Sequence, residues 1–419
     1  MQKRTVVAGS LLTVALIGAA MTPAHADDPV PPYTERISVD GSGGQAGAAS
    51  FGPASAERAV AFTSNAPLLS GDDNGASDVY LRTNTGTHLV SYAATVGGHS
   101  GDGRSYDPSV CAGGRFVAFV SEAANLTTTP RTDHEPRIYL RNRSVGKIGA
   151  IQATYQGVAL TAMGQPTISA DCQWVAFVAT PVTTDGSVSQ PRVYRYRVYD
   201  GSLAPVSRPS EDGSRAAGRP SISADGRYIA YQYTIPHPGG PANYSDVYVR
   251  DMETGGLEKA SVARDGGDAD RESTGPALSA DGRTVAFDSY ASNLAPGDTN
   301  GSANVFVRNL DTGRTKLVKG QGRKYYTYGA SLSADGLRVA YESGRLGDVS
   351  DLAGVWLADL GSRTAQLISV DTAGGPGDLP AGNASLSPDG TAVAFDSYAD
   401  DLVADDTNGT ADVFVRHLS

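Results

Sequence analysis

The sequence predicts an all-β protein, a seven-bladed β-propeller of four-stranded blades, and three observations carry this prediction. An apolar triplet recurs seven times along the chain, each repeat contains four short segments with strand composition, and the two chain ends supply matching parts of one repeat. A fixed period of this size indicates one supersecondary unit copied in an array. Four-stranded units repeated at this spacing are typical of a propeller.

The triplet consists of a β-branched residue, an alanine and an aromatic residue. Its copies follow one another at intervals of about 54 to 58 residues and begin at Val60, Val117, Val175, Ile229, Val285, Val339 and Val393. Each unit is too short for an independent β-sandwich of about 100 residues, so the propeller is the better interpretation.

The fifth repeat shows the four strands of a unit. Residues 276–282, PALSADG, predict a first strand that ends in an Asp281-Gly282 turn, where glycine tolerates a positive φ. Residues 283–291, RTVAFDSYA, predict the second strand, and a longer loop follows. Residues 304–310, NVFVRNL, are rich in β-branched and aromatic residues and predict the third, and RTKLVK predicts the fourth.

The last repeat lacks a fourth strand, and the N-terminus supplies one. The chain ends just after DVFVRHL, residues 412–418, whereas residues 37–40, ISVD, match residues 368–371 of the sixth repeat. An open ring would leave unpaired strand edges. We therefore predict that residues 33–40 pair with residues 412–418 and close the ring.

The N-terminal 26 residues read as a secretory signal peptide. Lys3 and Arg4 precede a short apolar run, and Ala24-His25-Ala26 forms an A-x-A cleavage pattern. A membrane anchor is the alternative, but the apolar run is short for a bilayer span. We expect cleavage after Ala26, a propeller domain over residues 27–419 and a secreted or extracytoplasmic protein.

Composition narrows the classes of partner. The net charge is −11, and removal of Lys3 and Arg4 makes the mature chain more acidic still. An acidic chain is a poor ligand for nucleic acid or an anionic membrane surface. The two cysteines, Cys111 and Cys172, lie near the first turn of adjacent repeats, and in an exported protein we expect them to form a disulfide. Two buried free thiols are the alternative.

A family resemblance follows from the turn motif. The segments SISADGRYIAYQ (221–232), LSADGRTVAFDS (278–289) and LSPDGTAVAFDS (386–397) share S-x-D-G followed by V/I-A-F/Y. They resemble the WD40-like repeat of TolB-type propellers, and the resemblance implies the propeller fold. TolB carries a separate α/β domain before its propeller; the sequence before the repeats leaves no room for it, so we expect a protein without that domain.

Two classes of function remain open. The leading hypothesis is a secreted, non-enzymatic propeller, expected to be a monomer, that binds a protein, peptide or glycan partner through its long-loop face. The alternative is a secreted polysaccharide-acting enzyme, a lyase or hydrolase with its site on the blades, because some related propellers are lyases. The sequence contains no G-x-S-x-G elbow, and we assign no catalytic residue.

The long loops supply candidate ligand-binding residues. The repeats exceed the 40–45 residues of a WD40 blade, and the extra residues fall in two loop sets that emerge on one face. The segment GQGRKYYTYGAS, residues 320–331, places Lys324, Tyr325, Tyr326 and Tyr328 there. Tyrosines beside a cation suit a sugar, peptide or protein. Packing between blades is the competing interpretation, and we favour it.

Three loops carry a D-x-N-G pattern that suggests calcium. Oxygen side chains surround a glycine at Asp72, Asn74 and Asp78, at Asp298, Asn300 and Asn304, and at Asp406, Asn408 and Asp412. Such oxygen atoms suit a hard cation. Asn-Gly is also an ordinary turn dipeptide, and Asp and Asn bond their own backbone in turns. We favour plain turns, require no cofactor and keep calcium as the alternative.

Overall fold

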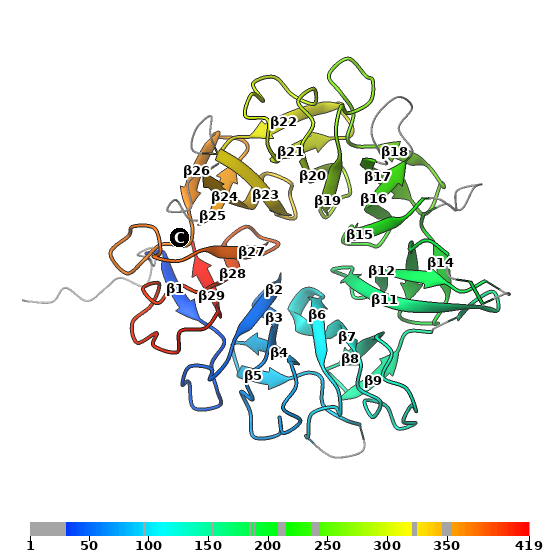
Figure 1. Cartoon of the computed structure of the whole chain (residues 1–419), viewed down its shortest axis with the longest axis vertical. Helices are drawn as coiled ribbons and strands as arrows, with labels where there is room; N and C mark the ends of the chain where they lie inside the picture. Colours follow the sequence, from blue (N-terminus) through cyan, green and yellow to red (C-terminus); the bar gives the residue numbers. More distant parts are fainter. Residues whose placement is uncertain are drawn as a thin grey trace, which may run out of the picture.

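The chain folds into a ring of seven antiparallel sheets, as Figure 1 shows, and residues of all seven blades line a cavity at its centre, in the central channel of the ring. The computed structural model describes residues 31–94, 98–152, 154–183, 186–187, 189–207, 215–235, 244–320, 325–345 and 354–418. The predicted signal peptide, residues 1–26, lies outside the described residues. The seven-bladed propeller expected from the repeat is confirmed.

The first four blades follow the chain order. Blade 1 contains β2 (Ser50–Ala56), β3 (Ala59–Ser64), β4 (Asp78–Thr83) and β5 (Gly86–Leu89). Blade 2 contains β6 (Ser105–Val110), β7 (Phe116–Ser121), β8 (Arg137–Asn142) and β9 (Lys147–Ala150), with a 3-10 turn η1 (Ala112–Gly114). Blade 3 contains β10 (Thr154–Tyr155), β11 (Val158–Ile168), β12 (Trp174–Pro181), β13 (Arg192–Arg197) and β14 (Leu203–Pro205). Blade 4 contains β15 (Ala217–Ile222), β16 (Tyr228–Ile235), β17 (Tyr244–Asp251) and β18 (Leu257–Lys259).

The last three blades complete the ring. Blade 5 contains β19 (Ser273–Leu278), β20 (Thr284–Ser289), β21 (Asn304–Asn309) and β22 (Arg314–Val318). Blade 6 contains β23 (Tyr325–Leu332), β24 (Arg338–Arg345), β25 (Gly354–Asp359) and β26 (Thr364–Leu367). Blade 7 contains β27 (Ala381–Leu386), β28 (Ala392–Ser397), β29 (Asp412–His417) and β1 (Tyr33–Arg36).

Blade 3 departs from the four-stranded expectation. Its innermost strand β11 is 11 residues long, and the short β10 pairs with its beginning through a tight turn at Gln156 and Gly157. Both turn residues have a positive φ, which allows the chain to reverse within two residues. The fifth strand is therefore an extension of the innermost strand and leaves the order of the other four unchanged.

The two chain ends meet in blade 7, as predicted. In Figure 1 the blue β1 lies beside the red β29, and Tyr33 pairs with His417 while Arg36 pairs with Phe414. The Ile37 N–H continues the ladder to the Val413 carbonyl at 2.8 Å. The N-terminal segment is therefore the fourth strand of the last blade.

The apolar triplet forms the core because the second strand of each blade is buried on both faces. Ala286 and Phe287 are fully buried, and Phe287 stacks on Phe306 of the neighbouring strand with ring centroids 6.0 Å apart. The same stack recurs in other blades as Phe62 with Tyr80, Phe119 with Tyr139, Phe177 with Tyr194 and Phe395 with Phe414. A run that is apolar on both faces is the signature of a strand covered from two sides, here by the adjacent blades.

The S-x-D-G motif builds a turn and links it to the next blade. The Ser279 hydroxyl donates to Asp281 Oδ1 at 2.6 Å and accepts the Thr284 N–H at 2.9 Å, while Gly282 has a φ of 72°. The Ala280 N–H donates to the Ala334 carbonyl of the next blade at 2.9 Å. The repeated motif is therefore structural, and such contacts link the turns of blades 2 to 7 at one end of the ring.

Cys111 and Cys172 form a disulfide between blades 2 and 3, with their Cα atoms 5.3 Å apart. Cys172 occupies the position that glycine takes in Ser279-Ala280-Asp281-Gly282, and its φ is 63°. A side chain is strained in this left-handed region. The disulfide therefore involves a cysteine that replaces the glycine of the repeated S-x-D-G turn.

Loss of the N-terminal strand should destabilise the entire ring. Removal of residues 27–40 leaves β29 with an unpaired edge and opens the ring, so we expect a large drop in melting temperature and loss of a single cooperative transition. Circular dichroism melts against a chain that begins at Asp27 measure this. Equal melting temperatures would contradict the closure.

The disulfide should contribute to stability through the unfolded state. Its closed segment spans a sequence separation of 61, for which the loop-entropy model gives about 4 kcal/mol. We expect the double variant C111A/C172A to unfold at lower denaturant, and C111A/C172G to recover about 1 kcal/mol because glycine tolerates the positive φ. Urea titrations of both variants and of the wild type, with and without reductant, test this; equal midpoints for the two variants would count against the strained turn.

Candidate binding site in the central channel

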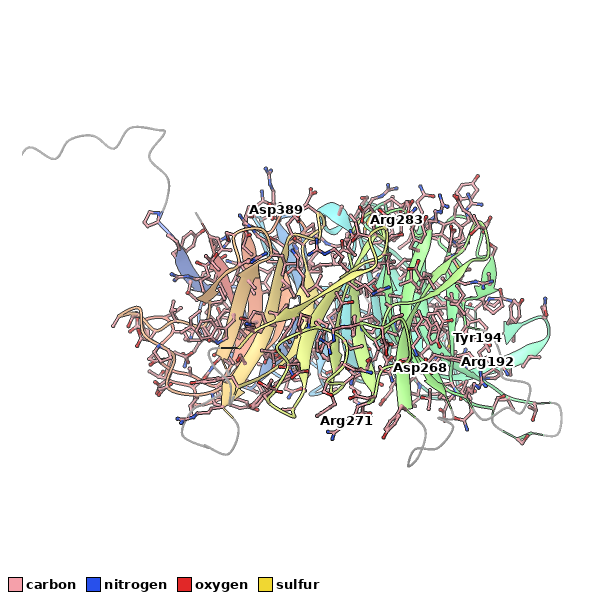
Figure 2. The ribbon with its side chains drawn as sticks, turned by 90° about the horizontal axis from the view of Figure 1, so that it is seen from above. Arg192, Tyr194, Asp268, Arg271, Arg283 and Asp389 are labelled. Atoms are coloured by element: carbon pink, nitrogen blue, oxygen red, sulfur yellow. A yellow bond between two sulfur atoms is a disulfide. The ribbon has the colours of Figure 1, made fainter. Side chains whose placement is uncertain are left out.

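The two faces of the disc differ. Figure 2 shows the ring edge-on, with Arg283 and Asp389 of the short S-x-D-G turns at one face, and Asp268 and Arg271 of the loop between blades 4 and 5 at the other. The short turns join first and second strands. The long loops therefore lie on the opposite face, as expected from the repeat length.

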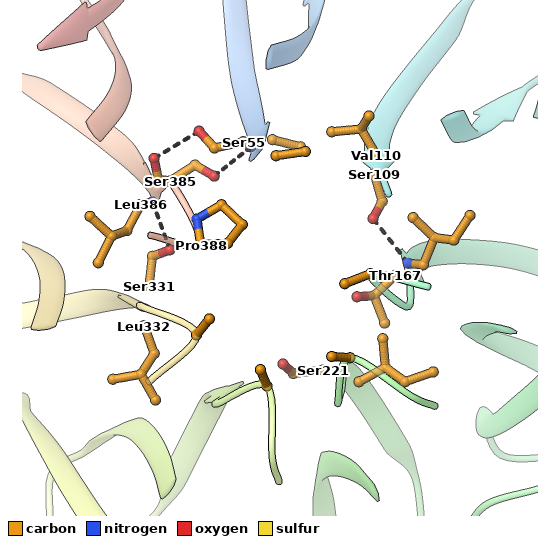
Figure 3. A pocket seen from close by; sticks show the side chains of 18 of the residues that line it. Ser55, Ser109, Val110, Thr167, Ser221, Ser331, Leu332, Ser385, Leu386 and Pro388 are labelled. Atoms are coloured by element: carbon orange, nitrogen blue, oxygen red, sulfur yellow. Dashed lines mark hydrogen bonds between the residues drawn. The ribbon is translucent and has the colours of Figure 1, made fainter. Parts of the chain in front are cut away.

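The channel end at the short turns is small and nearly uncharged. A cavity of about 300 Å³ is lined by serine, alanine and leucine side chains from all seven blades, shown in Figure 3, and Glu57 is its acidic member. Its hydroxyls join neighbouring blades: Ser331 Oγ accepts the Leu386 N–H at 2.9 Å, and Ser109 Oγ accepts the Ile168 N–H at 3.0 Å. These serines are structural.

Midway along the channel, a β-bulge interrupts every innermost strand. The pairing register shifts at the same place in each blade, and one residue there has a positive φ. These residues are Gly52, Asp107, Gln165, Arg219, Gly275, Gly329 and Asn383. The four that carry side chains are exposed, on the strands that border the channel. The bulges therefore give the channel wall polar side chains, which a regular strand would direct toward the neighbouring blades.

The bulge N–H groups require acceptors, and blades 5 to 7 supply carboxylates. Asp288, Glu342 and Asp396 directly follow the apolar triplet in these three blades. Asp288 Oδ2 accepts the Gly329 N–H at 3.1 Å and Glu342 Oε1 accepts the Asn383 N–H at 2.7 Å. Each acid thus reaches from its own blade to the next; we call Asp288, Glu342 and Asp396 the acidic sector.

The glycines beside the sector leave space for the carboxylates. A Cβ on Gly275 would lie 3.1 Å from Asp288 Oδ2, and one on Gly329 would lie 3.0 Å from Glu342 Oε1. Both glycines also have a positive φ. Blades 5 and 6 therefore place the acid of the second strand where a side chain of the first strand would otherwise stand.

In blades 2 and 3 the bulge residue itself supplies the acceptor, a carboxylate in blade 2 and a neutral amide in blade 3. In blade 3, Gln165 Oε1 accepts the Arg219 N–H at 2.7 Å, and in blade 2 Asp107 Oδ2 accepts the Gln165 N–H at 3.0 Å. The position after the triplet is then free to be apolar, as Val120 and Val178 are. The bulge therefore needs an acceptor but does not need the negative charge that blades 5 to 7 carry.

Burial disfavours the charged form of the whole acidic sector. It raises the pKa of Asp288 to about 6; the Arg219 charge opposes this rise, and the Glu342 charge adds to it. Burial likewise raises the pKa of Glu342 and of Asp396. Asp288 Oδ1 is buried and has no hydrogen-bond partner. The sector therefore has more negative charge than its surroundings compensate.

The predicted tyrosines divide between two places, and Lys324 lies outside the described residues. Tyr325 lines a cavity of about 350 Å³ with Lys319 and with the Asp298 loop, and Asn300 Nδ2 donates to the Tyr325 carbonyl at 2.7 Å. Successive side chains of a strand point to opposite sides, so the next tyrosine points away from this cavity.

Tyr326 and Tyr328 stack on each other and adjoin the acidic sector. Their ring centroids are 5.6 Å apart, and Tyr328 is paired in register with Glu342. Burial, together with the nearby Glu342 carboxylate, raises the pKa of Tyr328. These tyrosines belong to strand β23 rather than to a loop, so their predicted placement was wrong. The half-buried rings pack on each other beside Glu342, and ligand binding by them stays a prediction.

The D-x-N-G loop of blade 7 already contains a cation. Arg36 Nη1 lies 3.2 Å from Asp406 Oδ1 and 3.8 Å from Asp412 Oδ2, while Asn408 Nδ2 donates to Asp412 Oδ2 at 2.7 Å. In blade 4 Lys259 Nζ similarly lies 2.7 Å from the equivalent acid, Asp246. Side-chain cations thus compensate these carboxylates.

The other two loops are compensated differently. In blade 5 the position of the second acid holds neutral Asn304, whose Nδ2 donates to Asp298 Oδ1 at 3.1 Å. In blade 1 the Tyr80 hydroxyl donates to Asp72 Oδ2, and Asn74 Nδ2 donates to Asp78 Oδ2 at 2.8 Å. Calcium in these loops stays a prediction, and the amide donors agree with the turn interpretation that we favour.

Within the described residues, no side-chain cation forms an ion pair with the acid pair of blade 1. Asp72 and Asp78 are buried, and burial raises the pKa of Asp78 to about 8 against the favourable bond from Ser91; the charge of Asp72 raises it further. With this pKa, Asp78 retains its proton at neutral pH.

The prediction from sequence missed the acidic sector and Arg219. The available signal was an acidic residue directly after the triplet in three of the seven repeats. The bulges could not be recognised from the sequence, because four of the seven positive-φ positions are not glycines. These are Asp107, Gln165, Arg219 and Asn383. The sector therefore emerges only once the register shift is known.

Comparisons with known proteins identify the fold but no family. No family model matches the chain, and no curated protein does. An oligogalacturonate lyase from Vibrio parahaemolyticus is 13% identical and superposes with a TM-score of 0.56, over 93% of this chain and 98% of the lyase. An oligogalacturonate lyase in complex with manganese is 11% identical, with a TM-score of 0.57 over 93% and 97%. The chain shares their fold.

TolB from Acinetobacter baumannii is also similar, at 17% identity and a TM-score of 0.41. The match covers 69% of this chain and 58% of TolB, so the chain spans less than two thirds of that protein. At this score the likeness carries no argument beyond the propeller fold that the repeat motif had implied.

No helix in the described residues is long and apolar enough to span a membrane. Within the same residues, no three His, Cys, Asp or Glu side chains gather closely enough to hold a metal ion. The residues described here thus do not fit the manganese of the lyase, and we assign no step to such an ion.

The blade 1 pair should make stability depend on pH. Between the unfolded pKa of 3.8 and the folded value of about 8, the folded chain holds a proton that the unfolded chain has lost. Stability therefore falls as pH rises through that window. Asp78→Asn removes this titration, and Asn304 shows that asparagine fits the position. We expect the variant to gain about 2 °C or more on the wild type between pH 5 and 8.

Melting curves across that pH range, with about 1 mM calcium or with EDTA, test the prediction. A parallel shift of both proteins with pH would contradict it. A calcium-dependent rise in the wild type alone would show that an ion, rather than a proton, compensates the pair.

Proposed function

We propose that the protein is an exported, non-enzymatic binding module that holds a protein, peptide or glycan partner on its long-loop face, above the acidic sector. Export rests on the signal-peptide pattern of residues 1–26. Monomeric state and cleavage after Ala26 are parts of the same proposal.

The charge asymmetry of the ring is the observation that carries the proposal. Seven similar blades need an acceptor at the bulge, and Gln165 shows that an uncharged one suffices. Blades 5 to 7 nevertheless bury a second-strand carboxylate there at a cost in desolvation. Outside these three blades, Asp107 of blade 2 is a bulge carboxylate whose pKa burial also raises. Ionisable groups kept in unfavourable surroundings without a structural need mark functional sites.

Exposed tyrosines lie next to the same sector. Tyr290 follows Asp288 by two residues and Tyr398 follows Asp396 by two, and these side chains are 43% and 58% exposed. Both lie where the second strand ends and the long loop begins. Exposed aromatic rings beside buried polar groups are typical of binding surfaces.

The second candidate is an enzyme that acts on polysaccharide. It is favoured by the shared fold with proteins described as oligogalacturonate lyases. Asp288 also has a pKa of about 6, near the range of a general base, with the cation Arg219 close enough to affect it. The enzyme remains second because the likeness to these lyases, at 13% and 11% identity, extends to the fold alone.

A paired assay of binding and turnover separates the candidates. The protein is passed over immobilised polysaccharides and peptide libraries, and the same polysaccharides are assayed for unsaturated products by ultraviolet absorbance. We expect retention without product. Retention should fall at least about tenfold in Y290A/Y398A. The control is Y199A, which should not lower retention. Tyr199 is 87% exposed and lies in the turn between β13 and β14 of blade 3.

The outcomes divide cleanly. Product formed by the wild type and lost in D288N would establish the enzyme and overturn the binding module. Retention that depends equally on Tyr199 would also contradict the proposed surface.

A further inference from the structure

The residue before each apolar triplet lies next to the first turn of the following blade. In blade 4 this residue is Tyr228, and a Cβ on Gly282 of the next turn would lie 2.4 Å from Tyr228 Cδ2. In blade 3 it is Trp174, and a Cβ on Gly226 would lie 2.2 Å from Trp174 Cδ1. An aromatic ring at this position therefore fills the junction between two blades at the short-turn face.

An arginine lies over the ring at both of these junctions. Arg283 directly precedes β20, its Nη2 donates to the Tyr228 hydroxyl at 2.9 Å, and its guanidinium carbon lies 4.8 Å from the ring centroid. In blade 3 the guanidinium carbon of Arg195 lies 3.9 Å from the ring centroid of Trp174. The electrons of an aromatic face attract a guanidinium, so each contact stabilises the ring in its junction.

The junction between blades 7 and 1 lacks these filling side chains. The residue before the triplet of blade 7 is Ala392, which has no ring to place there. Asn84, directly after the third strand of blade 1, is exposed. Blades 3 to 7 have an apolar residue at that position, and it packs between its own blade and the preceding one; these residues are Val198, Met252, Leu310, Leu360 and Leu418.

A cavity of about 460 Å³ lies where those side chains are missing. Ala392 and Asn84 both line it, and Ile37 and Val415, which are buried, contribute apolar surface. Among the described residues, no Phe, Tyr or Trp lines this cavity. Pockets that hold small groups measure about 300–1,000 Å³, so the volume is large enough for an aromatic side chain.

The other small residues before a triplet show the same relation. Thr284 of blade 5 borders a second cavity, of about 400 Å³, at the junction with blade 6. Ala59 of blade 1 lies near Gly114 of the next turn, where Arg143 of blade 2 fills the space and donates to the Gly114 carbonyl at 3.1 Å. A small residue at this position thus leaves a cavity unless another side chain of the protein enters it.

Arg58 borders the cavity between blades 7 and 1 and corresponds in position to Arg283. It directly precedes β3, as Arg283 directly precedes β20. The Arg58 side chain is exposed, and its φ of 58° lies in the left-handed region, where a residue with a side chain is strained. The turn therefore places a guanidinium beside a cavity that has room for a ring.

The rim of the cavity offers hydrogen-bonding groups of both kinds. Arg58 and Asn84 carry donors, while Glu57 and Asp389 carry acceptors, and all four are exposed. Donors and acceptors together suit the N–H and C=O groups of a polypeptide backbone. A pocket with apolar walls and a polar rim is the usual receptor for an aromatic anchor of a protein partner.

We propose that the cavity between blades 7 and 1 binds an aromatic side chain presented by a peptide or protein partner, with the ring against the Arg58 guanidinium. The ring would take the place that Tyr228 fills between blades 4 and 5. The cavity lies at the short-turn face, opposite the long loops, so it is a second site that does not rest on the proposed function. Because β1, β29 and blade 1 all line it, an occupant also contacts the strands that close the ring.

Ligand-observed NMR titrations with capped tripeptides test the role of the ring. The probes are acetyl-Gly-Phe-Gly-amide and the same peptide with cyclohexylalanine, which has a similar shape but no aromatic electrons. We expect the phenylalanine peptide to bind about two- to fivefold more tightly, the range for a cation over a partly exposed ring. Equal binding of the two peptides would overturn the inference.

Arginine variants show whether Arg58 is the source of that preference. R58G should abolish the preference without lowering the melting temperature, because glycine tolerates the positive φ. The control is R271G, which removes an exposed arginine at the opposite face (Figure 2) and should keep the preference. A preference retained in R58G, or lost equally in both variants, would contradict the site.

Filling the cavity from within is an independent test. A392F supplies a ring from the protein itself, so we expect loss of peptide binding and a rise in melting temperature of about 1 °C or more. A365F adds the same side chain on the exposed part of β26 in blade 6 and should change neither. Unchanged peptide binding in folded A392F, or a lower melting temperature, would overturn the inference.

Two further measurements separate other occupants and the other site. Benzyl alcohol that binds as tightly as the phenylalanine peptide would indicate a free aromatic compound and reject the polypeptide partner. Y290A/Y398A should leave tripeptide binding unchanged, because these tyrosines lie at the start of the long loops. Loss of tripeptide binding in that variant would assign the peptide to the long-loop face, which would reject this site and leave the proposed function standing.

Discussion

Every blade depends on a neighbour on each side, so the closed ring is the constraint from which the structure follows. The second strands are apolar in both directions, and residues such as Ala286 and Phe287 reach full burial only between two further sheets. If only six of the seven blades had a fourth strand, the ring would be open at one junction between blades. The pairing of β1 with β29 removes that junction and gives each blade two partners.

Closure of the ring also determines the ion pairs of a surface loop. Arg36 belongs to the N-terminal strand, yet it provides the positive charge beside Asp406 and Asp412 at the other end of the chain. The loop of blade 7 is therefore compensated only in the closed ring. Blade 1 has the same loop without an equivalent strand-borne cation, which explains why related sequences at two positions meet such different electrostatic conditions.

The fold could be predicted from the sequence because its determinants are local and repeated. The triplet marks the second strand, the S-x-D-G turn marks its beginning, and Ile37-Ser38-Val39-Asp40 identifies the displaced strand. The candidate site could be predicted only in fragments. Tyr326 and Tyr328 were assigned to a long loop, whereas the structure places them in β23. Arg219 and Asn383 could be recognised only once the bulges were known.

Physical reasons explain this division. A bulge breaks the two-residue alternation of a strand at one point. The first strands are short, six residues in blade 5, so the sequence pattern does not reveal where that break falls. Compensation of the D-x-N-G loops depends on Arg36 and Lys259, which lie outside the motif and meet it through sheet pairing. Patterns within one repeat predict the backbone structure well. Whether a loop carboxylate forms an ion pair depends on residues outside the motif.

A ring of seven similar blades also raises a problem of orientation that the acidic sector resolves. A partner that contacted only repeated features, such as the S-x-D-G turns, would meet seven nearly equivalent positions and could bind in any of them. Carboxylates after the triplet in blades 5 to 7, with Val120 and Val178 at the same position in blades 2 and 3, break that equivalence. Because the bulge requires an acceptor but not a particular one, each blade can differ here without losing its link to the next. The residue after the triplet can therefore be charged in some blades and uncharged in others without loss of the bulge. This difference in charge between blades is able to fix a single orientation for a bound partner.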